Sequence, residues 1–219
     1  GELTMALART RPGARVVGVD VSPELIEAAR QRGGGYGNLS FAQADASSWS
    51  EPGFSPDVVV SRHGVMFFDD PVAAFTNLHA MATDEAELVF SCFRNPGENP
   101  WASDIGRLLE LPPPADHKAP GPFAFADPQH VEDILSAAGW YGIGFEPVDF
   151  AYIAGQGEDP VEDAMQLFRR IGPAAAALRQ LEGDARTRAE GWIRDWVAEH
   201  RSGDLVAFPA AAWIVTAAH

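Results

Sequence analysis

The chain has 219 residues, of which 46% are hydrophobic and 21% are charged, a composition typical of folded globular proteins rather than disordered ones. Its 31 acidic and 16 basic residues give a formal net charge of −15, which disfavours nucleic acid and anionic membranes as partners. No apolar run is long enough to cross a membrane, no secretion signal opens the sequence, and the single cysteine, Cys92, has no internal disulfide partner. These features predict a soluble, cytoplasmic protein.

The first hundred residues alternate between short β-branched runs and amphipathic helical patterns, as in a parallel α/β sheet. Ser22 and Pro23 predict one helix start, because serine caps helix N-termini and proline fits the first helical turn. The run over 57–61 has the composition of a fully buried strand. In chain order the pattern predicts a helix over 2–9, a strand over 14–20, a helix from 23, strands over 39–44 and 57–61, a helix from 71, and a strand over 87–93.

This alternation stops after Phe93. The segment 95–126 contains a short helical stretch and a run of prolines, and we interpret it as an inserted lid. Two late strands with no helical crossover after the last one predict an antiparallel hairpin at the sheet edge. The elements expected after the lid are a helix from 128 that stops at Gly139, a strand over 140–151, two helices, and a strand over 208–217.

The two helices between the late strands have apolar residues at helical spacing. The inward residues expected in the first helix are Val161, Met165, Phe168 and Ile171. Those expected in the second are Ala189, Trp192, Ile193, Trp196 and Val197.

Two acidic residues lie at the carboxyl ends of neighbouring predicted strands, where open α/β sheets bind their ligands. Asp20 can accept both hydroxyls of a ribose, or it only supports the turn into the next helix; Ser22 already caps that helix, which favours the ligand role. Asp45 can accept a hydrogen bond from an exocyclic amine while Ala46 offers a backbone N–H. Its alternative is a cap for the turn over 46–49.

Small and polar residues follow the strand 57–61, and an apolar run comes next. This order suits a ligand floor that begins at Ser61 and leads into a hydrophobic pocket. His63 is either a general base or a hydrogen-bonded loop histidine. Phe67 and Phe68 are candidates for the pocket wall, although core packing is the alternative for at least one residue of the run.

Other kinds of site find no support in the sequence. The six histidines form no His-x-x-x-His or Cys–His spacing, so no metal site is predicted. Neither a Gly-x-Ser-x-Gly elbow nor a phosphate-binding glycine–lysine turn occurs. Cys92 lies within a predicted strand, which favours a small core residue over a nucleophile.

Taken in order, the strand-end motifs resemble those of the class I S-adenosylmethionine-dependent methyltransferases. Residues 16–23, Val-Val-Gly-Val-Asp-Val-Ser-Pro, are similar to the acidic ribose-binding motif of that family, and residues 38–46 to its adenine-binding motif. Residues 57–68 look like the strand and loop beside the methionine moiety. Residues 1–8 look like the stretch that begins with the last glycine of the family's Gly-x-Gly-x-Gly motif.

The family's first strand and most of its glycine loop would therefore lie upstream of Gly1. A sheet without that strand is expected to have a gap with unpaired backbone groups on both neighbouring strands. The resemblance implies a doubly wound Rossmann-like α/β sheet, mostly parallel, with an antiparallel C-terminal hairpin and a small inserted lid. It divides the chain into a cofactor-binding half over 1–94, the lid over 95–126, and a C-terminal half of the same domain over 127–219.

The activity that the resemblance implies is transfer of a methyl group from S-adenosyl-L-methionine to a small-molecule acceptor by in-line displacement. Asp20 would hold the ribose and Asp45 the adenine amine, and His63 is the candidate catalytic residue. The candidates for cofactor binding are Gly1, Asp20, Val21, Asp45, Ala46 and Ser61. The candidates for the acceptor pocket are Phe67, Phe68, Trp101, Phe123 and Phe125.

Two other functions stay open at this point. One is an NAD(P)-dependent oxidoreductase, whose ribose-binding acid lies at the same strand end. The other is a methyltransferase-like protein that binds without catalysis. The second acid, Asp45, and the terminal hairpin favour the methyltransferase, and the chain has no Tyr-x-x-x-Lys pair of short-chain dehydrogenases. The acceptor and the oligomeric state do not follow from the sequence.

Overall fold

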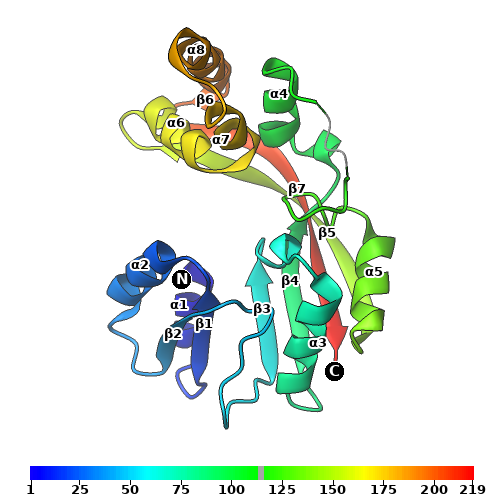
Figure 1. The fold of residues 1–219 in the computed structure, drawn as a ribbon. Coiled ribbons are helices and arrows are strands. Elements are labelled where there is room, and N and C mark those ends of the chain that lie inside the picture. Colours follow the sequence, from blue (N-terminus) through cyan, green and yellow to red (C-terminus); the bar gives the residue numbers. More distant parts are fainter. Residues whose placement is uncertain (113–115) are drawn as a thin grey trace.

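The computed structural model describes residues 1–112 and 116–219, so residues 113–115 of the predicted lid lie outside the described residues. The strands form two sheets with helices packed around them (Figure 1). In the smaller sheet, β1 (Val16–Asp20) pairs in parallel with β2 (Leu39–Gln43). In the larger sheet the strand order is β3-β4-β7-β5.

The larger sheet combines a parallel pair with an antiparallel hairpin. Strand β3 (Val58–Arg62) runs parallel to β4 (Glu87–Phe93), and β7 (Leu205–Ala218) runs antiparallel to β4. Strand β5 (Tyr141–Gln156) pairs antiparallel with β7 on the other side. The predicted hairpin is therefore confirmed, with β5 at the edge and β7 inside the sheet. A two-residue strand, β6 (Arg201–Ser202), forms a short turn with the start of β7.

The helices of the first half begin where the sequence predicts. Helix α1 is Glu2–Thr10, α2 is Pro23–Gly33 and α3 is Pro71–Met81. The hydroxyl of Ser22 accepts the backbone N–H of Leu25 at 3.2 Å, and Asp70 Oδ1 accepts that of Ala73 at 3.0 Å. Each contact satisfies a donor that the first helical turn leaves free, which fixes the start of α2 and of α3.

The predicted burial of the strand 57–61 is wrong. Val58 is 46% exposed, and Val59 and Val60 are only half-buried. The reason is that, among the described residues, β3 has a strand partner on one side only, and the same holds for β1. By contrast β4, which has a partner on each side, is buried at Leu88 and over residues 90–93. The expected gap in the sheet thus lies between β1 and β3.

The segment after β4 contains the 3₁₀-helix η2 (Pro96–Glu98) and α4 (Pro100–Leu108). Another 3₁₀-helix, η1 (Val65–Phe67), follows β3. Helix α5 (Pro128–Ala137) begins at the cap Asp127 and is followed by Gly139, whose φ of +97° confirms the predicted stop. The backbone there adopts a conformation that side chains with a Cβ rarely tolerate.

Three helices are carried on the far ends of β5 and β7, away from α3 and α5 (Figure 1). They are α6 (Pro160–Arg170), α7 (Gly172–Leu178) and α8 (Gly183–Glu199). We call them the helical cap. The sequence pattern did not predict α7, a short helix of small residues with no apolar stripe.

Two residues expected to face inward in the cap are exposed. Ile171 is 44% exposed because α6 ends at Arg170, so the helical period does not extend to it. Trp192 is 51% exposed because the buried stripe of α8 is narrow and runs through Ala189, Ile193 and Val197. No helix among the described residues is both long enough and apolar enough to cross a membrane.

Candidate functional site

The carboxyl ends of β1 and β2 bring Asp20 and Asp45 to one edge of the smaller sheet. Asp20 pairs with Gln43, and the N–H of Ala44 donates to the carbonyl oxygen of Asp20 at 3.0 Å, so Asp45 follows directly. The Oδ1 atom of Asp20 accepts the N–H of Ser22 at 2.8 Å. Within the described residues its Oδ2 atom accepts no hydrogen bond. Asp20 therefore supports the turn with one oxygen and keeps the other available.

Asp45 makes a similar turn. Its Oδ1 atom accepts the N–H of Ser47 at 2.8 Å, and these contacts with Ser47 hold the pKa of the exposed carboxyl below its usual value. The carbonyl oxygen of Asp45 also accepts the N–H of Trp49 at 2.8 Å. Asp45 is thus ionised at neutral pH and open to solvent, beside the half-buried Ala46.

Gly1 lies at the start of α1, where a Cβ would come within 2.7 Å of the Cβ of Ala29 in α2. Glycine therefore permits close packing of the two helices. The N–H of Met5 donates to the carbonyl oxygen of Gly1, so the N–H groups of the first turn before it have no partner inside the helix. Val21, the next residue after Asp20, is 63% exposed.

The end of β3 lies close to the start of α1. Arg62 forms an ion pair with Glu2 at 2.8 Å, and the guanidinium group holds the pKa of the Glu2 carboxyl below its usual value. Both side chains are more than half exposed, so the pair adds little stability. The ion pair does show that the loop after the half-buried Ser61 faces the N-terminus of α1.

His63 follows in a left-handed backbone conformation, with φ at +53°. The ring of His63 stacks on Phe93 with 4.1 Å between centroids, and the backbone N–H of His63 donates to the carbonyl oxygen of Ser91 at 3.0 Å. The Nδ1 atom is buried and makes no hydrogen bond within the described residues, and the same is true of Ser91 Oγ. Burial, together with the nearby charge of Arg62, lowers the pKa of His63 to about 4, so its imidazole is neutral at pH 7.

Two aromatic rings lie beside His63 and three more follow on from Phe93, and we call these five side chains the aromatic wall. Trp101 lies 4.9 Å from Phe93 and 6.0 Å from Phe123 between ring centroids. Tyr152 stacks on Trp101 at 4.9 Å, and Phe150 lies 6.4 Å from His63. The members of the aromatic wall are Phe93, Trp101, Phe123, Phe150 and Tyr152.

The predicted pocket residues therefore separate into two groups. Phe123 and Trp101, which is only 4% exposed, belong to the aromatic wall and both pack on Phe93, the ring that stacks on His63. Phe125 is 2% exposed and packs 6.2 Å from the core residue Phe75, and Phe68 meets the same ring edge-on at 5.9 Å. Phe67 is 53% exposed at the surface. The structure does not bring these last three to the aromatic wall.

Phe93, Phe150 and Tyr152 are the members of the aromatic wall that the sequence analysis did not name as site candidates. Phe150 and Tyr152 lie two positions apart on β5, so their side chains share one face of the strand. Two aromatic residues at a spacing of two, near the end of the predicted strand, were the sequence feature that could have indicated them.

The position of Trp101 is fixed by Asn99, which is fully buried. Asn99 Oδ1 accepts the indole N–H of Trp101 at 3.2 Å and the backbone N–H of Ala211 at 3.1 Å. Its amide nitrogen donates to the carbonyl oxygens of Asn95 and Ala211, both at 3.1 Å. One side chain thus joins the start of α4 to β7 and orients the aromatic wall.

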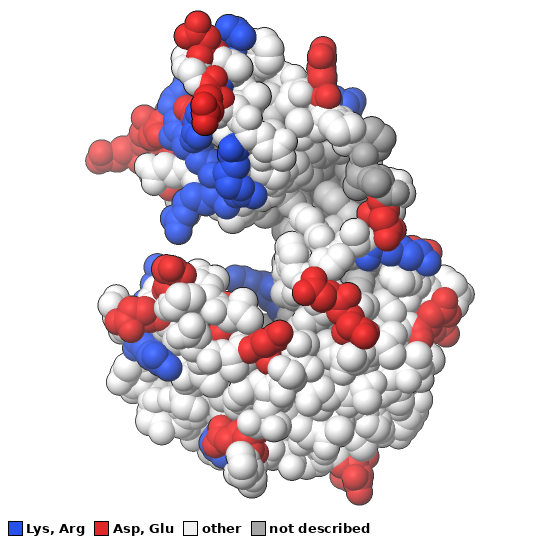
Figure 2. All heavy atoms as spheres, in the orientation of Figure 1, with Lys and Arg blue, Asp and Glu red and all other residues white. Residues whose placement is uncertain are grey.

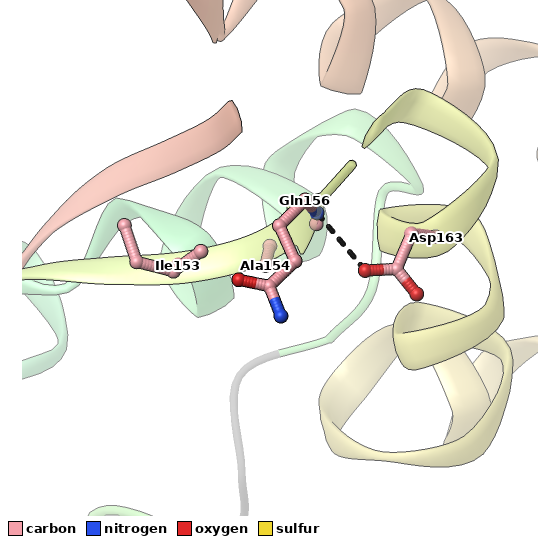
Figure 3. A pocket seen from close by; sticks show the side chains of 5 residues that line it. Ile153, Ala154, Gln156 and Asp163 are labelled. Atoms are coloured by element: carbon pink, nitrogen blue, oxygen red, sulfur yellow. Dashed lines mark hydrogen bonds between the residues drawn. The ribbon is translucent and has the colours of Figure 1, made fainter. Parts of the chain in front are cut away.

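The helical cap is anchored to β5 at a pocket of about 240 Å³ lined by Ile153, Ala154, Gly155, Gln156 and Asp163 (Figure 3). Asp163 Oδ2 accepts the backbone N–H of Gln156 at 2.9 Å. A Cβ on Gly155 would lie 2.0 Å from the carbonyl oxygen of Pro160, so α6 rests directly on the strand backbone. This contact sets where the cap lies.

An opening separates the helical cap from the part of the molecule that contains α1, α2, β1 and β2, and arginine side chains gather on the cap's side of it (Figures 1 and 2). Within the described parts of the chain, no group of three or more His, Cys, Asp or Glu side chains is arranged to hold a metal ion. The site is therefore built from strand-end carboxylates, a neutral histidine, aromatic rings and arginines.

Comparisons with known proteins show which sequences and folds this chain resembles. Residues 1–85 match the family model described as a methyltransferase domain. The chain is 25% identical over 210 residues to a trans-aconitate 2-methyltransferase of Methylobacterium radiotolerans, covering 87% of this chain and 77% of that protein. A protein of the same name from Streptomyces coelicolor is 47% identical over 65 residues, which cover 28% of this chain and 21% of that one.

Solved structures share the fold. One is phosphoethanolamine N-methyltransferase 2 of Haemonchus contortus in complex with phosphomonomethylethanolamine and S-adenosylhomocysteine. It superposes with a TM-score of 0.50 at 16% identity and covers 97% of this chain and 45% of its own.

Proposed function

This chain belongs to the class I S-adenosylmethionine-dependent methyltransferases, and we propose that it methylates a carboxylate oxygen of a small-molecule acceptor. The observation that supports this acceptor is the likeness, over most of the chain, to proteins named trans-aconitate 2-methyltransferase. Trans-aconitate is the first acceptor to test. The basic side chains beside the opening also suit a small acid.

The residues at the strand ends fit the cofactor. Asp20 has one carboxylate oxygen available for the ribose hydroxyls, and Asp45, one strand further, is ionised and exposed to receive the adenine amine. Ala46 and Val21 would flank the ring and the ribose. The first-turn N–H groups of α1, which begins at Gly1, would lie toward the methionine end.

When bound, S-adenosyl-L-methionine would supply an electrophilic sulfonium methyl group, and the acceptor oxygen would take the methyl while the thioether leaves as S-adenosylhomocysteine. A carboxylate acceptor is already ionised at pH 7 and needs no base. His63, neutral at that pH, would therefore orient the acceptor through a hydrogen bond rather than remove a proton. Ser61 and the ring of Phe93 would help to exclude water from the reacting atoms.

The test is transfer of an isotope-labelled methyl group to trans-aconitate, with a phenol and a primary amine as comparison acceptors. We expect S-adenosylhomocysteine and a labelled product whose label is released by mild alkali, as a methyl ester requires. Transfer only to the phenol or the amine, with a label that is stable to alkali, would contradict the carboxylate assignment.

A further inference from the structure

Two buried side-chain polar atoms of the described residues have no hydrogen-bond partner. One is Nδ1 of His63, and the other is Oγ of Ser91, a residue that is 9% exposed in the interior of β4. A buried polar group without a partner is costly, so proteins usually satisfy it with another protein group or with ordered water. Each of these two atoms is therefore expected to bind a polar group in solution.

The backbone brings His63 and Ser91 together. Arg62 pairs with Ser91 across β3 and β4, and the backbone N–H of His63 donates to the carbonyl oxygen of Ser91 at 3.0 Å. In a histidine side chain, Nδ1 is the ring nitrogen that is bonded next to the Cβ attachment, and Nε2 is the distal one. Nδ1 of His63 therefore lies at the end of the ring that is closer to this backbone contact with Ser91.

Both side chains also lie on one face of β4. Ser91 and Phe93 are two positions apart on this strand, so their side chains point to the same face. The ring of His63 stacks on Phe93, which places the imidazole on that face as well. Cys92, between them, points to the opposite face, where its sulfur lies 3.5 Å from the carbonyl oxygen of Phe125. The two atoms without partners thus share one side of the sheet, beside the ring of Phe93.

The other side chains next to Ser91 in the sheet do not serve its hydroxyl. Those two positions away on β4 are apolar, and its partner on β7 is Ile214. Arg62, its partner on β3, directs its guanidinium group to Glu2. Among the described neighbours of Ser91 in the sheet, the imidazole of His63 is the polar group that also lacks a partner.

We infer that His63 Nδ1 and Ser91 Oγ hold one water molecule between them, and that Ser91 is thereby a positioning residue for the imidazole. In this structure the two atoms do not bond each other directly, and a water can bond both. The inference rests on the proposed function for the proton: a carboxylate only accepts hydrogen bonds, so His63 must carry its proton on Nε2. Nδ1 then accepts a hydrogen bond from the water.

The water determines which way the imidazole faces. Stacking on Phe93 fixes the plane of the ring, but a half-turn about the Cβ–Cγ bond keeps that plane and exchanges Nδ1 with a carbon. Only one of the two orientations places Nδ1 at the water. In that orientation Nε2 lies at the far end of the ring and can donate to the acceptor, while the water stays behind the ring, away from the reacting atoms.

The experiment is nitrogen nuclear magnetic resonance, at pH 7, of protein whose histidine rings are isotope-labelled. The signals of His63 are those that disappear in His63→Asn. A ring nitrogen that carries a proton resonates far upfield of one that does not, and an unprotonated nitrogen moves upfield when it accepts a hydrogen bond. In the wild type we expect Nε2 to carry the proton and Nδ1 to show the signal of a hydrogen-bonded acceptor.

Ser91→Thr and Ser91→Val are the matched pair. Threonine and valine have nearly the same shape and both suit a strand, but only threonine keeps the hydroxyl. We expect the Nδ1 signal of Ser91→Thr to stay near that of the wild type, and that of Ser91→Val to move downfield because the water is lost. Should valine prevent folding, Ser91→Ala removes the hydroxyl without adding volume, and its Nδ1 signal is expected to move in the same direction.

Two results would overturn the inference. One is an Nδ1 signal that does not differ between variants with and without the hydroxyl, because Ser91 would then have no link to the ring. The other is a wild-type protein in which Nδ1 carries the proton, because Nε2 could then not donate to a carboxylate. Urea unfolding at pH 7 confirms that the compared variants are folded.

A positioning role also predicts a change in acceptor binding. We expect the apparent KM for trans-aconitate to rise about tenfold in Ser91→Val and to change by less than about twofold in Ser91→Thr. Affinity for S-adenosylhomocysteine should be equal in both, because Ser91 lies in β4 and not at the ends of β1 and β2. Equal KM values in the two variants would contradict the positioning role.

The resonance measurement needs no acceptor, so its outcome is separable from that of the proposed function. The expected Nδ1 signals, in a protein that transfers no methyl group to carboxylates, would support the water between His63 and Ser91 and refute the proposed activity. Transfer to carboxylates by a protein whose Nδ1 signal ignores the hydroxyl of Ser91 would support the activity and overturn the inference.

Discussion

The imidazole ring of His63 stacks on the ring of Phe93, with 4.1 Å between centroids and 14° between planes. This stack places a titratable group inside an apolar surface directly after β3, where it has lost water and gained no hydrogen bond at Nδ1. In this position His63 has a left-handed backbone, with φ at +53°, and the pKa of its imidazole is lowered to about 4. Both features have measurable consequences.

The first prediction concerns stability against pH. The unfolded chain binds a proton at this imidazole near pH 6.5, but the folded protein does so only near pH 4. Between pH 6.5 and pH 4 the unfolded chain therefore binds a proton that the folded protein does not, so lowering the pH through this interval reduces the free energy of unfolding. Above pH 6.5 and below pH 4, His63 causes no further change of stability with pH. We expect wild-type stability to decrease across this interval more steeply than that of His63→Asn.

Asparagine is the suitable replacement because it tolerates the left-handed backbone. His79 and His130, whose pKa values burial also lowers, are present in both proteins and cancel in the comparison. The measurement is urea unfolding at pH 7 and pH 4.5. If the free energy of unfolding fell by the same amount in both proteins between these pH values, the conclusion that His63 is buried and neutral would be wrong.

The second prediction assigns the charge of Asp20 to ligand binding. In Asp20→Asn the amide oxygen can still accept the N–H of Ser22, so the turn is retained while the charge is removed. We expect affinity for S-adenosylhomocysteine to fall at least tenfold, about 1.4 kcal/mol, because a charge-assisted contact with the ribose is lost. Asp84→Asn, at an exposed turn before β4, is the control and should bind normally. An unchanged affinity in Asp20→Asn would remove Asp20 from the site.

The third prediction concerns Asn99. In Asn99→Ala, the indole N–H of Trp101 and the buried backbone N–H of Ala211 lose their acceptor, whereas the carbonyl oxygen of Ala211 keeps the N–H of Arg94. An unsatisfied buried polar group costs roughly 1–3 kcal/mol, so we expect a loss of about 3 kcal/mol in the free energy of unfolding. Chemical denaturation measures it, and the near-ultraviolet signal of tryptophan should change as Trp101 is released. A loss below about 0.5 kcal/mol would contradict the network.

The fourth prediction concerns the single cysteine. Cys92 is fully buried in β4, and burial raises the pKa of its thiol to about 12. The thiolate is the reactive form, so the native protein should react with a thiol reagent at pH 8 far more slowly than the same protein in denaturant. Rapid labelling of the native protein, at a rate close to that of the unfolded chain, would show that the strand opens.

How far the sequence predicts this molecule depends on whether a feature is set by local residues or by tertiary packing. Local signals sufficed where one residue controls one backbone feature, as at the caps Ser22 and Asp127 and at the stop Gly139. Burial of β3 was mispredicted because it depends on which strands lie beside it, and a run of valines carries no information on its neighbours. The exposure of Ile171 and Trp192 was not predicted for a related reason. The spacing of apolar residues in the sequence does not show at which residue a helix ends or how much of its surface packs against the core.

The candidate site shows the same division. Asp20 and Asp45 could be placed together because parallel strands end at a common edge. The aromatic wall could not, because it joins residues of β4, β5, α4 and the segment before α5, whose approach depends on tertiary packing. Phe125 illustrates the limit: it lies two residues from Phe123 but faces the core ring of Phe75.

The measurement that tests the central claim most directly is calorimetric titration of S-adenosylhomocysteine and, separately, NADH into the protein. The carboxylates at the ends of β1 and β2 suit an adenosyl group, so we predict binding of S-adenosylhomocysteine with a dissociation constant in the micromolar range and no detectable binding of NADH. Binding of NADH alone, or of neither compound, would contradict the assignment of this strand edge to the methyl donor.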